Sequence, residues 1–439
     1  MSKTITFVVQ PGGKLQGQVR VPGDKSMSHR SIMLGSIAEG ITHVKGFLQA
    51  EDALATLQAF RDMGVVIEGP ENGEVTIHGV GKHGLKAPTK PLYLGNSGTS
   101  MRLLSGLLAG QAFDSVLTGD KSLSWRPMKR VTKPLAKMGA VIATTETGTA
   151  PLHITGQAGK LKGIDYQMPI ASAQVKSCLL LAGMYAEGDT STTEPAPTRD
   201  HTERMLAGFG YPVKREGSKA TINANGKLHA AEIDVPSDIS SAAFFLVGAS
   251  IAEGSDVLLK HVGINPTRTG VIDILRLMGA HIEILNERVV GGEPVADLHV
   301  VAQPLKGIDI PEALVPLAID EFPVLFVAAA CAEGQTRLSG AKELRVKESD
   351  RIQVMADGLQ ILGVDAQPTE DGMIINSSPI GGGEVISHGD HRIAMAFAIA
   401  GLRASAPITI HDCENVNTSF PEFKDLATQL GLHLNSREG

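Results

Sequence analysis

Ala38-Glu39-Gly40-Ile41-Thr42 joins an apolar, helix-like run to a β-branched stretch, and turns of this type return along the 439-residue chain. The other copies are Leu108-Ala109-Gly110, Ala186-Glu187-Gly188-Asp189-Thr190, Ala252-Glu253-Gly254-Ser255, Ala332-Glu333-Gly334-Gln335-Thr336 and, in weaker form, Arg403-Ala404-Ser405. A second mark, an apolar residue followed by glycine, recurs between them at Gly64, Gly139, Gly210, Gly279, Gly363 and Gly431. Such self-similarity indicates a repeat architecture. The sequence therefore predicts six copies of one unit, each with two helices and a few strands.

The first unit shows the expected order of elements: a helix over 28–38, a strand over 42–47, a second helix over 52–63 and a strand over 65–68. The equivalent first helices are expected over 103–109, 175–185, 242–251, 324–332 and 393–402. All of these are strongly apolar and are therefore expected to be buried on most faces. The second helices should end at the glycine marks, because glycine readily adopts the left-handed conformation that follows many helices.

Composition excludes several classes of function. A net charge of −7 argues against a general nucleic-acid surface, and one Trp with four Tyr makes a base-stacking platform improbable. The three cysteines, at 178, 331 and 413, have no CxxC spacing, which disfavours a disulfide framework or a thiolate metal site. The longest apolar run, 322–332, is too short to span a membrane, and the first nine residues read as a strand. We expect a soluble cytoplasmic protein.

Two Pro-Gly or Pro-Ser interruptions divide the repeats into groups of three. Val21-Pro22-Gly23-Asp24 and Val235-Pro236-Ser237-Asp238 lie at opposite ends of the first three units. We therefore expect a lobe of residues 23–236, inserted after a short N-terminal strand, and a discontinuous lobe of residues 1–22 and 237–439. Two covalent connections between similar lobes favour hinge closure over a ligand.

Short polar clusters stand ahead of the first helices. They are Asp24-Lys25-Ser26-Met27-Ser28-His29-Arg30, Asn96-Ser97-Gly98-Thr99-Ser100-Met101-Arg102, Ser172-Ala173-Gln174, Pro236-Ser237-Asp238, Asp320-Glu321-Phe322-Pro323 and Gly389-Asp390-His391-Arg392. A helix start offers unpaired N–H donors and the positive end of the helix dipole, which together bind anions. Ordinary N-capping explains the Ser, Thr, Asn and Asp residues equally well.

Capping does not explain the cations. Lys25 and Arg392 stand at the starts of first helices, and Arg126, Arg199 and the run Arg345-Val346-Lys347-Glu348-Ser349-Asp350-Arg351 stand at the starts of second helices. A cation there opposes the helix dipole unless an external anion offsets it. The pattern predicts substrates with several negative charges, because Arg binds carboxylate and phosphate through its planar fork and Lys binds phosphate as a point charge.

Two carboxylates interrupt this cationic set, Asp320 and Glu348. Glu348 has an ordinary interpretation, as a surface residue paired with Arg351 three residues on. Alternatively, an acid and a base among cations move protons to and from uncharged centres of a bound polyanion. No metal site is predicted, since His388 and His391 have no third ligand at a recognisable spacing, and no dinucleotide motif occurs.

Six motifs together resemble one family. They are Asp24-Lys25-Ser26 with Arg30, Leu94-Gly95-Asn96-Ser97-Gly98-Thr99 with Arg102, Arg126-Pro127-Met128, Ser172-Ala173-Gln174, the run from Arg345 to Arg351, and Asp390-His391-Arg392. In this order, and over nearly the whole chain, they resemble the 5-enolpyruvylshikimate-3-phosphate synthases. The resemblance implies an α/β fold of the inside-out barrel type, with two similar lobes of three βαβαββ repeats each and helix N-termini facing the cleft between the lobes.

The resemblance also implies an activity: transfer of the enolpyruvyl group of phosphoenolpyruvate to the 5-hydroxyl of shikimate 3-phosphate, through a tetrahedral intermediate and with release of phosphate. This reaction belongs to aromatic amino-acid biosynthesis. No metal or organic cofactor is expected, the partners are the two small substrates, and the protein is expected to be a monomer.

The resemblance implies a role for each motif residue. Ser26 and Arg30 would hold the shikimate carboxylate, and Ser172, Ala173, Gln174, Arg199 and Lys347 would surround the phosphate and ring oxygens of shikimate 3-phosphate. Lys25 would bridge both substrates and is expected to be catalytic together with Asp320 and Glu348. Arg126 and the backbone of Gly98 would take the phosphate of phosphoenolpyruvate, and Arg351 and Arg392 its carboxylate. Asn96 and Gln174 would also contact phosphoenolpyruvate. Asp320 would accept the proton of the attacking hydroxyl, and Glu348 would protonate the methylene carbon.

Four departures from the family pattern stand out. Many members have Lys at the position of Thr418, Asn at that of Glu343, Ser at that of Ala173 and Pro at that of Leu103. These replacements resemble a divergent bacterial branch. Two alternatives stay open: the related transferase that acts on UDP-N-acetylglucosamine, which depends on a loop cysteine, and a non-catalytic repeat protein that binds a phosphorylated metabolite.

Overall fold

The computed structural model describes residues 4–439 and divides the chain into two compact units. The split unit comprises the described residues up to Pro22 together with 236–439, and the inserted unit comprises 23–235. Pro236, which the sequence placed at the end of the inserted lobe, belongs to the split unit. Residues 1–3 of the expected first strand lie outside the described residues.

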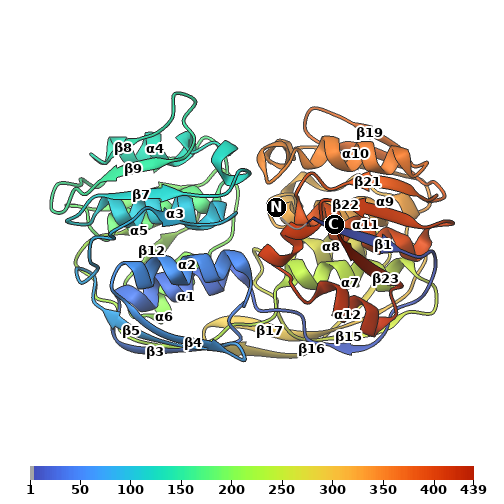
Figure 1. Cartoon of the computed structure of the whole chain (residues 1–439), viewed down its shortest axis with the longest axis horizontal. Coiled ribbons are helices and arrows are strands. Elements are labelled where there is room, and N and C mark those ends of the chain that lie inside the picture. Colours follow the sequence, from blue (N-terminus) through green and yellow to red (C-terminus); the bar gives the residue numbers. More distant parts are fainter. Residues whose placement is uncertain (1–3) are drawn as a thin grey trace. The chain divides into compact units, whose positions relative to one another are not determined.

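The inserted unit contains three βαβαββ repeats (Figure 1). The second consists of β6 (Leu92–Tyr93), α3 (Gly98–Ala109), β7 (Ser115–Thr118), α4 (Lys129–Lys137), β8 (Val141–Ala143) and β9 (Leu152–Thr155). The third consists of β10 (Asp165–Gln167), α5 (Ala173–Gly183), β11 (Thr190–Thr193), α6 (His201–Gly208), β12 (Lys214–Glu216) and β13 (Lys219–Ile222). The first is formed by α1 (Lys25–Ile37), β3 (Glu39–Lys45), α2 (Glu51–Asp62), β4 (Val66–Glu71), β5 (Glu74–Val80) and, from the end of the unit, β14 (Glu232–Asp234).

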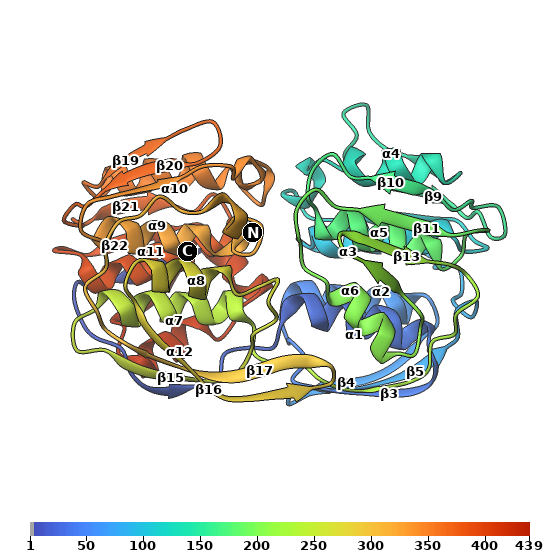
Figure 2. The ribbon, with the colours of Figure 1, turned by 180° about the vertical axis from the view of Figure 1, so that it is seen from behind.

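Each of these repeats forms one sheet with the same strand pattern. The orders are β14-β3-β5-β4, β6-β7-β9-β8 and β10-β11-β13-β12. In each sheet the first pair is parallel and the other two pairs are antiparallel. Figure 2 shows β11 and β13 beside α5, and α3 packs against α5. The repeat inferred from the turns is therefore a physical unit of one sheet and two helices.

The split unit repeats the plan. Its elements are β1 (Ile5–Val9), β2 (Gln16–Val19), α7 (Ile239–Ile251), β15 (Asp256–Gly263), α8 (Gly270–Leu277), β16 (His281–Val290), β17 (Glu293–Val301), α9 (Phe322–Cys331), β18 (Gln335–Leu338), α10 (Arg351–Ile361), β19 (Asp365–Pro368), β20 (Met373–Asn376), β21 (Gly383–Ile386), α11 (His391–Ala400), β22 (Ile408–His411), α12 (Phe423–Leu430) and β23 (Leu434–Glu438). Short 3-10 helices include η3 (Ile319–Glu321), η4 (Lys342–Val346) and η6 (Glu414–Thr418).

The N-terminal strands complete two repeats of the split unit. Its sheets have the orders β16-β17-β15-β2, β18-β20-β19 and β21-β22-β1-β23. Strand β2 pairs in parallel with β15, and β1 lies between β22 and β23, antiparallel to both. Among residues 4–439, no sheet closes on itself into a barrel.

The second helices end where the glycine marks predicted. Gly64, Gly139, Gly210, Gly279, Gly363 and Gly431 follow α2, α4, α6, α8, α10 and α12, and their φ angles are all positive, from 78° to 123°. The expected helix ends are confirmed. The expected starts were several residues late, since α1 begins at Lys25 and α3 at Gly98. Polar residues before the apolar runs form the caps and first turns of these helices, which places Lys25 and Arg392 on the first turns of α1 and α11.

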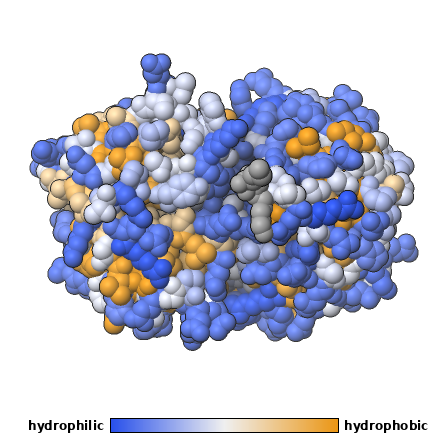
Figure 3. Space-filling view, viewed as in Figure 1, coloured by the Kyte–Doolittle hydropathy of each residue, from blue (hydrophilic) through white to orange (hydrophobic). Residues whose placement is uncertain are grey.

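Each unit has a hydrophobic core of its own. One cluster of buried residues runs from Phe7 to Val21 and from Ile239 to Leu434, and the other lies within residues 27–235. The first helices supply much of both clusters, and α7 is buried along its whole length. Figure 3 shows a largely hydrophilic face with scattered hydrophobic patches. The helices are thus held by burial on most sides, which fixes the position of their N-terminal turns.

Candidate active site

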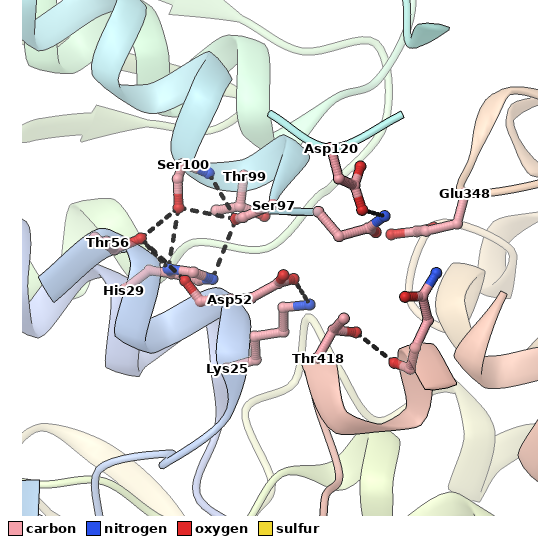
Figure 4. A network of polar contacts seen from close by, with 12 residues as sticks. Lys25, His29, Asp52, Thr56, Ser97, Thr99, Ser100, Asp120, Glu348 and Thr418 are labelled. Atoms are coloured by element: carbon pink, nitrogen blue, oxygen red, sulfur yellow. Dashed lines mark hydrogen bonds and ion pairs between the residues drawn. The ribbon is translucent and has the colours of Figure 1, made fainter. Parts of the chain in front are cut away.

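In the inserted unit, Lys25 is the first residue of α1, directly after its N-cap Asp24. Its ammonium forms an ion pair with the carboxylate of Asp52, whose side chain is 2% exposed. Figure 4 shows this pair, with the two side chains coming from neighbouring helices. The sequence reading missed Asp52, because acidic residues in the first turn of a helix are common and complement the helix dipole.

Arg30 lies one turn further along α1 and is 4% exposed. Its guanidinium donates to the backbone oxygen of Ser26 at 3.0 Å, to Oγ1 of Thr202 at 2.7 Å and to Oγ of Ser177 at 3.1 Å. These contacts join α1 to α5 and α6. They hold the predicted carboxylate-binding arginine in one orientation.

Arg126 lies against the N-terminus of α3. Its Nη2 donates to Oδ1 of Asn96 at 2.5 Å, and Nδ2 of Asn96 donates to Asp120 at 2.8 Å. A β-carbon placed on Gly98 would lie 2.8 Å from Nη1 of Arg126, so a larger residue there would displace the guanidinium from this position. The first amides of α3 and a cation thus stand together, which is the arrangement that binds phosphate.

The start of α5 is hydrogen-bonded to the N-terminal part of α3. Ser172 caps α5 by accepting from the N–H of Val175 at 3.3 Å, and Ala173 is the first helical residue. Gln174 accepts from Arg102 at 2.5 Å and donates to Oγ1 of Thr99 at 3.1 Å. Arg102 was quoted in a motif without a role. The contact with Arg102 orients the side-chain amide of Gln174, which the family resemblance expects to contact both substrates.

Arg199 stands directly before Asp200, the N-cap residue of α6, and its side chain is half-buried. Asp200 itself forms ion pairs with Arg204 at 2.9 Å and Arg215 at 3.0 Å. In the inserted unit, therefore, the predicted residues Lys25, Ser26, Arg30, Asn96, Gly98, Arg126, Ser172, Ala173, Gln174 and Arg199 all lie at or within about one turn of helix starts.

In the split unit, Arg351 is the centre of a carboxylate cluster. It is 1% exposed, and it donates from Nε to Asp390 at 2.9 Å, from Nη1 to Asp320 at 3.2 Å and from Nη2 to Glu348 at 2.7 Å. Burial opposes the charge of the guanidinium, but the neighbouring charges of Asp390, Glu348 and Asp320 raise the pKa of Arg351. Both predicted proton-transfer carboxylates are thus anchored on one buried cation.

The cluster joins three helix starts. Asp320 lies on η3 ahead of α9, Glu348 lies between η4 and α10, and Asp390 caps α11. The pair of Glu348 and Arg351 that the ordinary interpretation expected does exist, but it is not a surface pair, since Arg351 is buried. Lys347 approaches Asp320 at 3.5 Å.

Arg392 occupies the first turn of α11, where its N–H donates to Asp390 at 3.0 Å. Its half-buried guanidinium forms no hydrogen bond or ion pair within residues 4–439. Arg392 is therefore a cation of the cluster that is available to a substrate anion, whereas Arg351 is occupied by carboxylates of the chain itself.

The four departures from the family pattern have simple local settings. Thr418 is 2% exposed and donates to the backbone oxygen of Asn415 at 2.7 Å, a contact also drawn in Figure 4. Leu103 is fully buried in α3, Ala173 is the first residue of α5, and Glu343 lies on η4.

Within the described part of the chain, no group of three or more His, Cys, Asp or Glu could hold a metal ion, and no helix is long and apolar enough to cross a membrane.

Comparison with known proteins places the chain in a family. Residues 9–426 match the family described as EPSP synthase (3-phosphoshikimate 1-carboxyvinyltransferase). The chain is 70% identical to a 3-phosphoshikimate 1-carboxyvinyltransferase of Methylococcus capsulatus, over 98% of this chain and 99% of the relative. It is 61% identical to that of Legionella pneumophila, with 98% and 99% covered. The chain belongs to the EPSP synthase family.

Solved structures agree with the fold. A structure of EPSP synthase from Acinetobacter baumannii has a TM-score of 0.87 and 65% identity, covering 99% of this chain and all of the other. The enolpyruvyl transferase NikO of Streptomyces tendae has a TM-score of 0.79 at 15% identity, with 99% of each chain covered, and shows the fold alone. The two-unit α/β arrangement predicted from the repeats is thereby confirmed.

Proposed function

We propose that this protein transfers the enolpyruvyl group of phosphoenolpyruvate to the 5-hydroxyl of shikimate 3-phosphate and releases phosphate. Membership of the EPSP synthase family supports the reaction, and relatives of 60–70% identity carry the name 3-phosphoshikimate 1-carboxyvinyltransferase. The observation that carries the chemistry is the anchoring of Asp320 and Glu348 on buried Arg351. Two carboxylates among the cations would weaken the attraction of a bound polyanion, so binding alone does not favour them at this position.

The inserted unit supplies most of the anion contacts. Arg126 and the N-terminal amides of α3 receive the phosphate of phosphoenolpyruvate, with Asn96 and Gln174 beside them. Arg30 and Ser26 hold the shikimate carboxylate, and Ser172, Ala173, Gln174 and Arg199 hold the remaining oxygens. Lys25, oriented by Asp52, contacts both substrates. Neutralising these charges lets two anions approach each other, and fixed orientation lowers the entropic barrier to their reaction.

The split unit moves the protons. Asp320 accepts the proton of the 5-hydroxyl as its oxygen attacks C2 of phosphoenolpyruvate. Glu348, after it leaves Arg351 and takes up a proton from solvent, delivers this proton to the methylene carbon, which becomes a methyl group in the tetrahedral intermediate. Removal of one methyl proton and departure of phosphate then restore the double bond. Proton transfer by a positioned carboxyl group contributes roughly 10²- to 10⁴-fold to a rate.

Arg351 links the two proton-transfer groups to the substrate. In the structure its donors are taken by Asp320, Glu348 and Asp390. We propose that the carboxylate of phosphoenolpyruvate binds Arg392 and competes with Glu348 for Nη2 of Arg351. This competition releases Glu348 toward the methylene carbon only when substrate is present. Lys347 holds Asp320 and contacts shikimate 3-phosphate.

The direct test is phosphate release by the purified protein with both substrates and no added metal or cofactor. We expect release only when shikimate 3-phosphate and phosphoenolpyruvate are both present. Replacing shikimate 3-phosphate with UDP-N-acetylglucosamine should give no release. Absence of phosphate with the first pair, across pH values and concentrations, would refute the proposed reaction.

A further inference from the structure

His29 lies beneath the N-terminus of α3, in the interior of the inserted unit. The imidazole is 0% exposed, and three buried hydroxyl groups surround it, those of Thr56, Ser97 and Ser100. They come from α2, from the N-cap of α3 and from its first turn. Figure 4 shows the four side chains pointing toward one another. The reaction scheme above uses none of them.

The four groups form a closed ring of hydrogen bonds. Thr56 Oγ1 lies 2.8 Å from Nδ1 of His29 and 2.5 Å from Ser100 Oγ. Ser100 Oγ lies 2.8 Å from Ser97 Oγ, which lies 3.4 Å from Nε2 of His29. A fifth contact, 3.2 Å between Ser100 Oγ and Nδ1 of His29, crosses the ring. Three hydroxyl protons and one imidazole proton are enough for the four contacts around the ring, in either direction. The ring is therefore complete with a neutral imidazole.

The surroundings keep the imidazole neutral. Burial lowers the pKa of His29 well below its ordinary value, the charges of Lys25 and Arg30 lower it further, and only Asp24 opposes them. A neutral imidazole already brings the one ring proton that the four contacts around the ring need. Geometry and charge thus agree on the neutral form.

The ring includes the N-cap residue of α3, the helix that begins at Gly98. Ser97 is the N-cap residue of α3, and its Oγ accepts from the backbone N–H of Ser100 at 3.1 Å. The same oxygen contacts His29 and the Ser100 hydroxyl. The rotamer of Ser97 sets the direction of the first free amides of α3, because the cap fixes the backbone of that turn.

We infer that neutral His29 is a positioning residue for phosphoenolpyruvate, which orients the Ser97 cap and thereby the α3 amides that receive the substrate phosphate. This inference rests on the proposed function, and it concerns one substrate only. The contacts of Arg30 to Ser26, Thr202 and Ser177 do not pass through the ring, so binding of shikimate 3-phosphate should depend on it much less.

The test separates the two substrates. His29→Leu removes all three contacts of the imidazole with the ring hydroxyls at similar volume. It should raise KM for phosphoenolpyruvate about fivefold or more, the usual effect of losing a cap, with less than about a twofold change for shikimate 3-phosphate. His29→Gln, whose amide supplies a donor and an acceptor, should restore part of the loss. In Ser97→Ala, adding His29→Leu should cost little more, since the ring is already open.

Ser31→Ala is the matched control. Ser31 follows His29 by two residues on α1 and is fully buried, and within residues 4–439 its hydroxyl donates only to the backbone oxygen of Met27, at 2.8 Å. This variant should leave both KM values unchanged. If His29→Leu does not fold, the KM values of Ser100→Ala test the inference instead. Ser100→Ala removes one hydroxyl from the ring, but the backbone N–H of residue 100 can still donate to Ser97 Oγ.

The outcomes distinguish this inference from the proposed reaction. Phosphate release by the wild type, with equal KM changes for both substrates in His29→Leu or Ser100→Ala, would overturn the positioning role alone. If the wild type releases no phosphate, calorimetric binding of phosphoenolpyruvate to the wild type and the same variants still tests the inference. Equal affinity in all of them would overturn it.

Discussion

At the scale of single residues, Arg351 explains why the two proposed proton-transfer groups lie together. One buried guanidinium contacts Asp320, Glu348 and Asp390, which come from three different helix starts of the split unit. An uncompensated buried charge is costly, so each carboxylate is needed to keep the arginine in place, and the arginine holds each carboxylate. The chemistry and the local stability therefore share the same contacts.

Glu348→Gln should separate the chemistry from binding. The amide keeps the shape and an oxygen for Arg351 but cannot deliver a proton to carbon. We expect turnover to fall roughly 10²- to 10⁴-fold, with the affinity for shikimate 3-phosphate nearly unchanged by calorimetry. A rate within a factor of two of the wild type would show that another group protonates the methylene carbon.

Gly98→Ala should weaken binding of phosphoenolpyruvate. The added β-carbon would lie 2.8 Å from Nη1 of Arg126, so the guanidinium must move away from the α3 amides. An overpacking cost of about 1–3 kcal/mol, if lost from binding, corresponds to a rise in KM of roughly 5- to 150-fold. Gly208→Ala, in α6 with nothing within 4 Å, is the control and should leave KM unchanged. Equal KM values for both variants would contradict the packing argument.

At the scale of the elements, the glycines that end the second helices act through backbone conformation. Gly363 has a φ of 86°, and no atom lies within 4 Å of a β-carbon placed there. Gly363→Ala should therefore lose roughly 1–2 kcal/mol of stability from strain alone. Gly208→Ala has equal space without a positive φ, and it should gain up to about 1 kcal/mol. Thermal unfolding of the two variants measures the difference, and equal midpoints would contradict it.

Much of the element order could be predicted from the sequence, because each repeat carries its own turn and glycine marks. The starts of the first helices could not, since Lys25, Ser26 and Gly98 look like loop residues until their caps are seen. Arginines and lysines at these starts pointed to the candidate site. Asp52 was missed, and Arg102 and His29 received no role, because an acid in a first turn, or a buried polar residue in an apolar helix, has no distinctive spacing.

At the scale of the molecule, the inserted unit has its own core and three complete sheets. A fragment of residues 23–235 should therefore fold alone, with native-like circular dichroism and a cooperative thermal transition. The matched fragment 23–231 lacks β14, which pairs with β3, and should melt at a lower temperature. A fragment 23–235 without cooperative unfolding would show that the unit depends on the rest of the chain.

In the proposed reaction, the 5-hydroxyl oxygen and a proton add across the double bond of phosphoenolpyruvate, and the proton goes to the methylene carbon. Phosphate and one methyl proton are then eliminated. The reaction run in D₂O and followed by proton NMR tests this most directly. Because the methylene carbon passes through a methyl group, the vinyl group of the product should contain deuterium, and phosphate should accumulate with it. A product with an undeuterated vinyl group, or no product at all, would contradict the account.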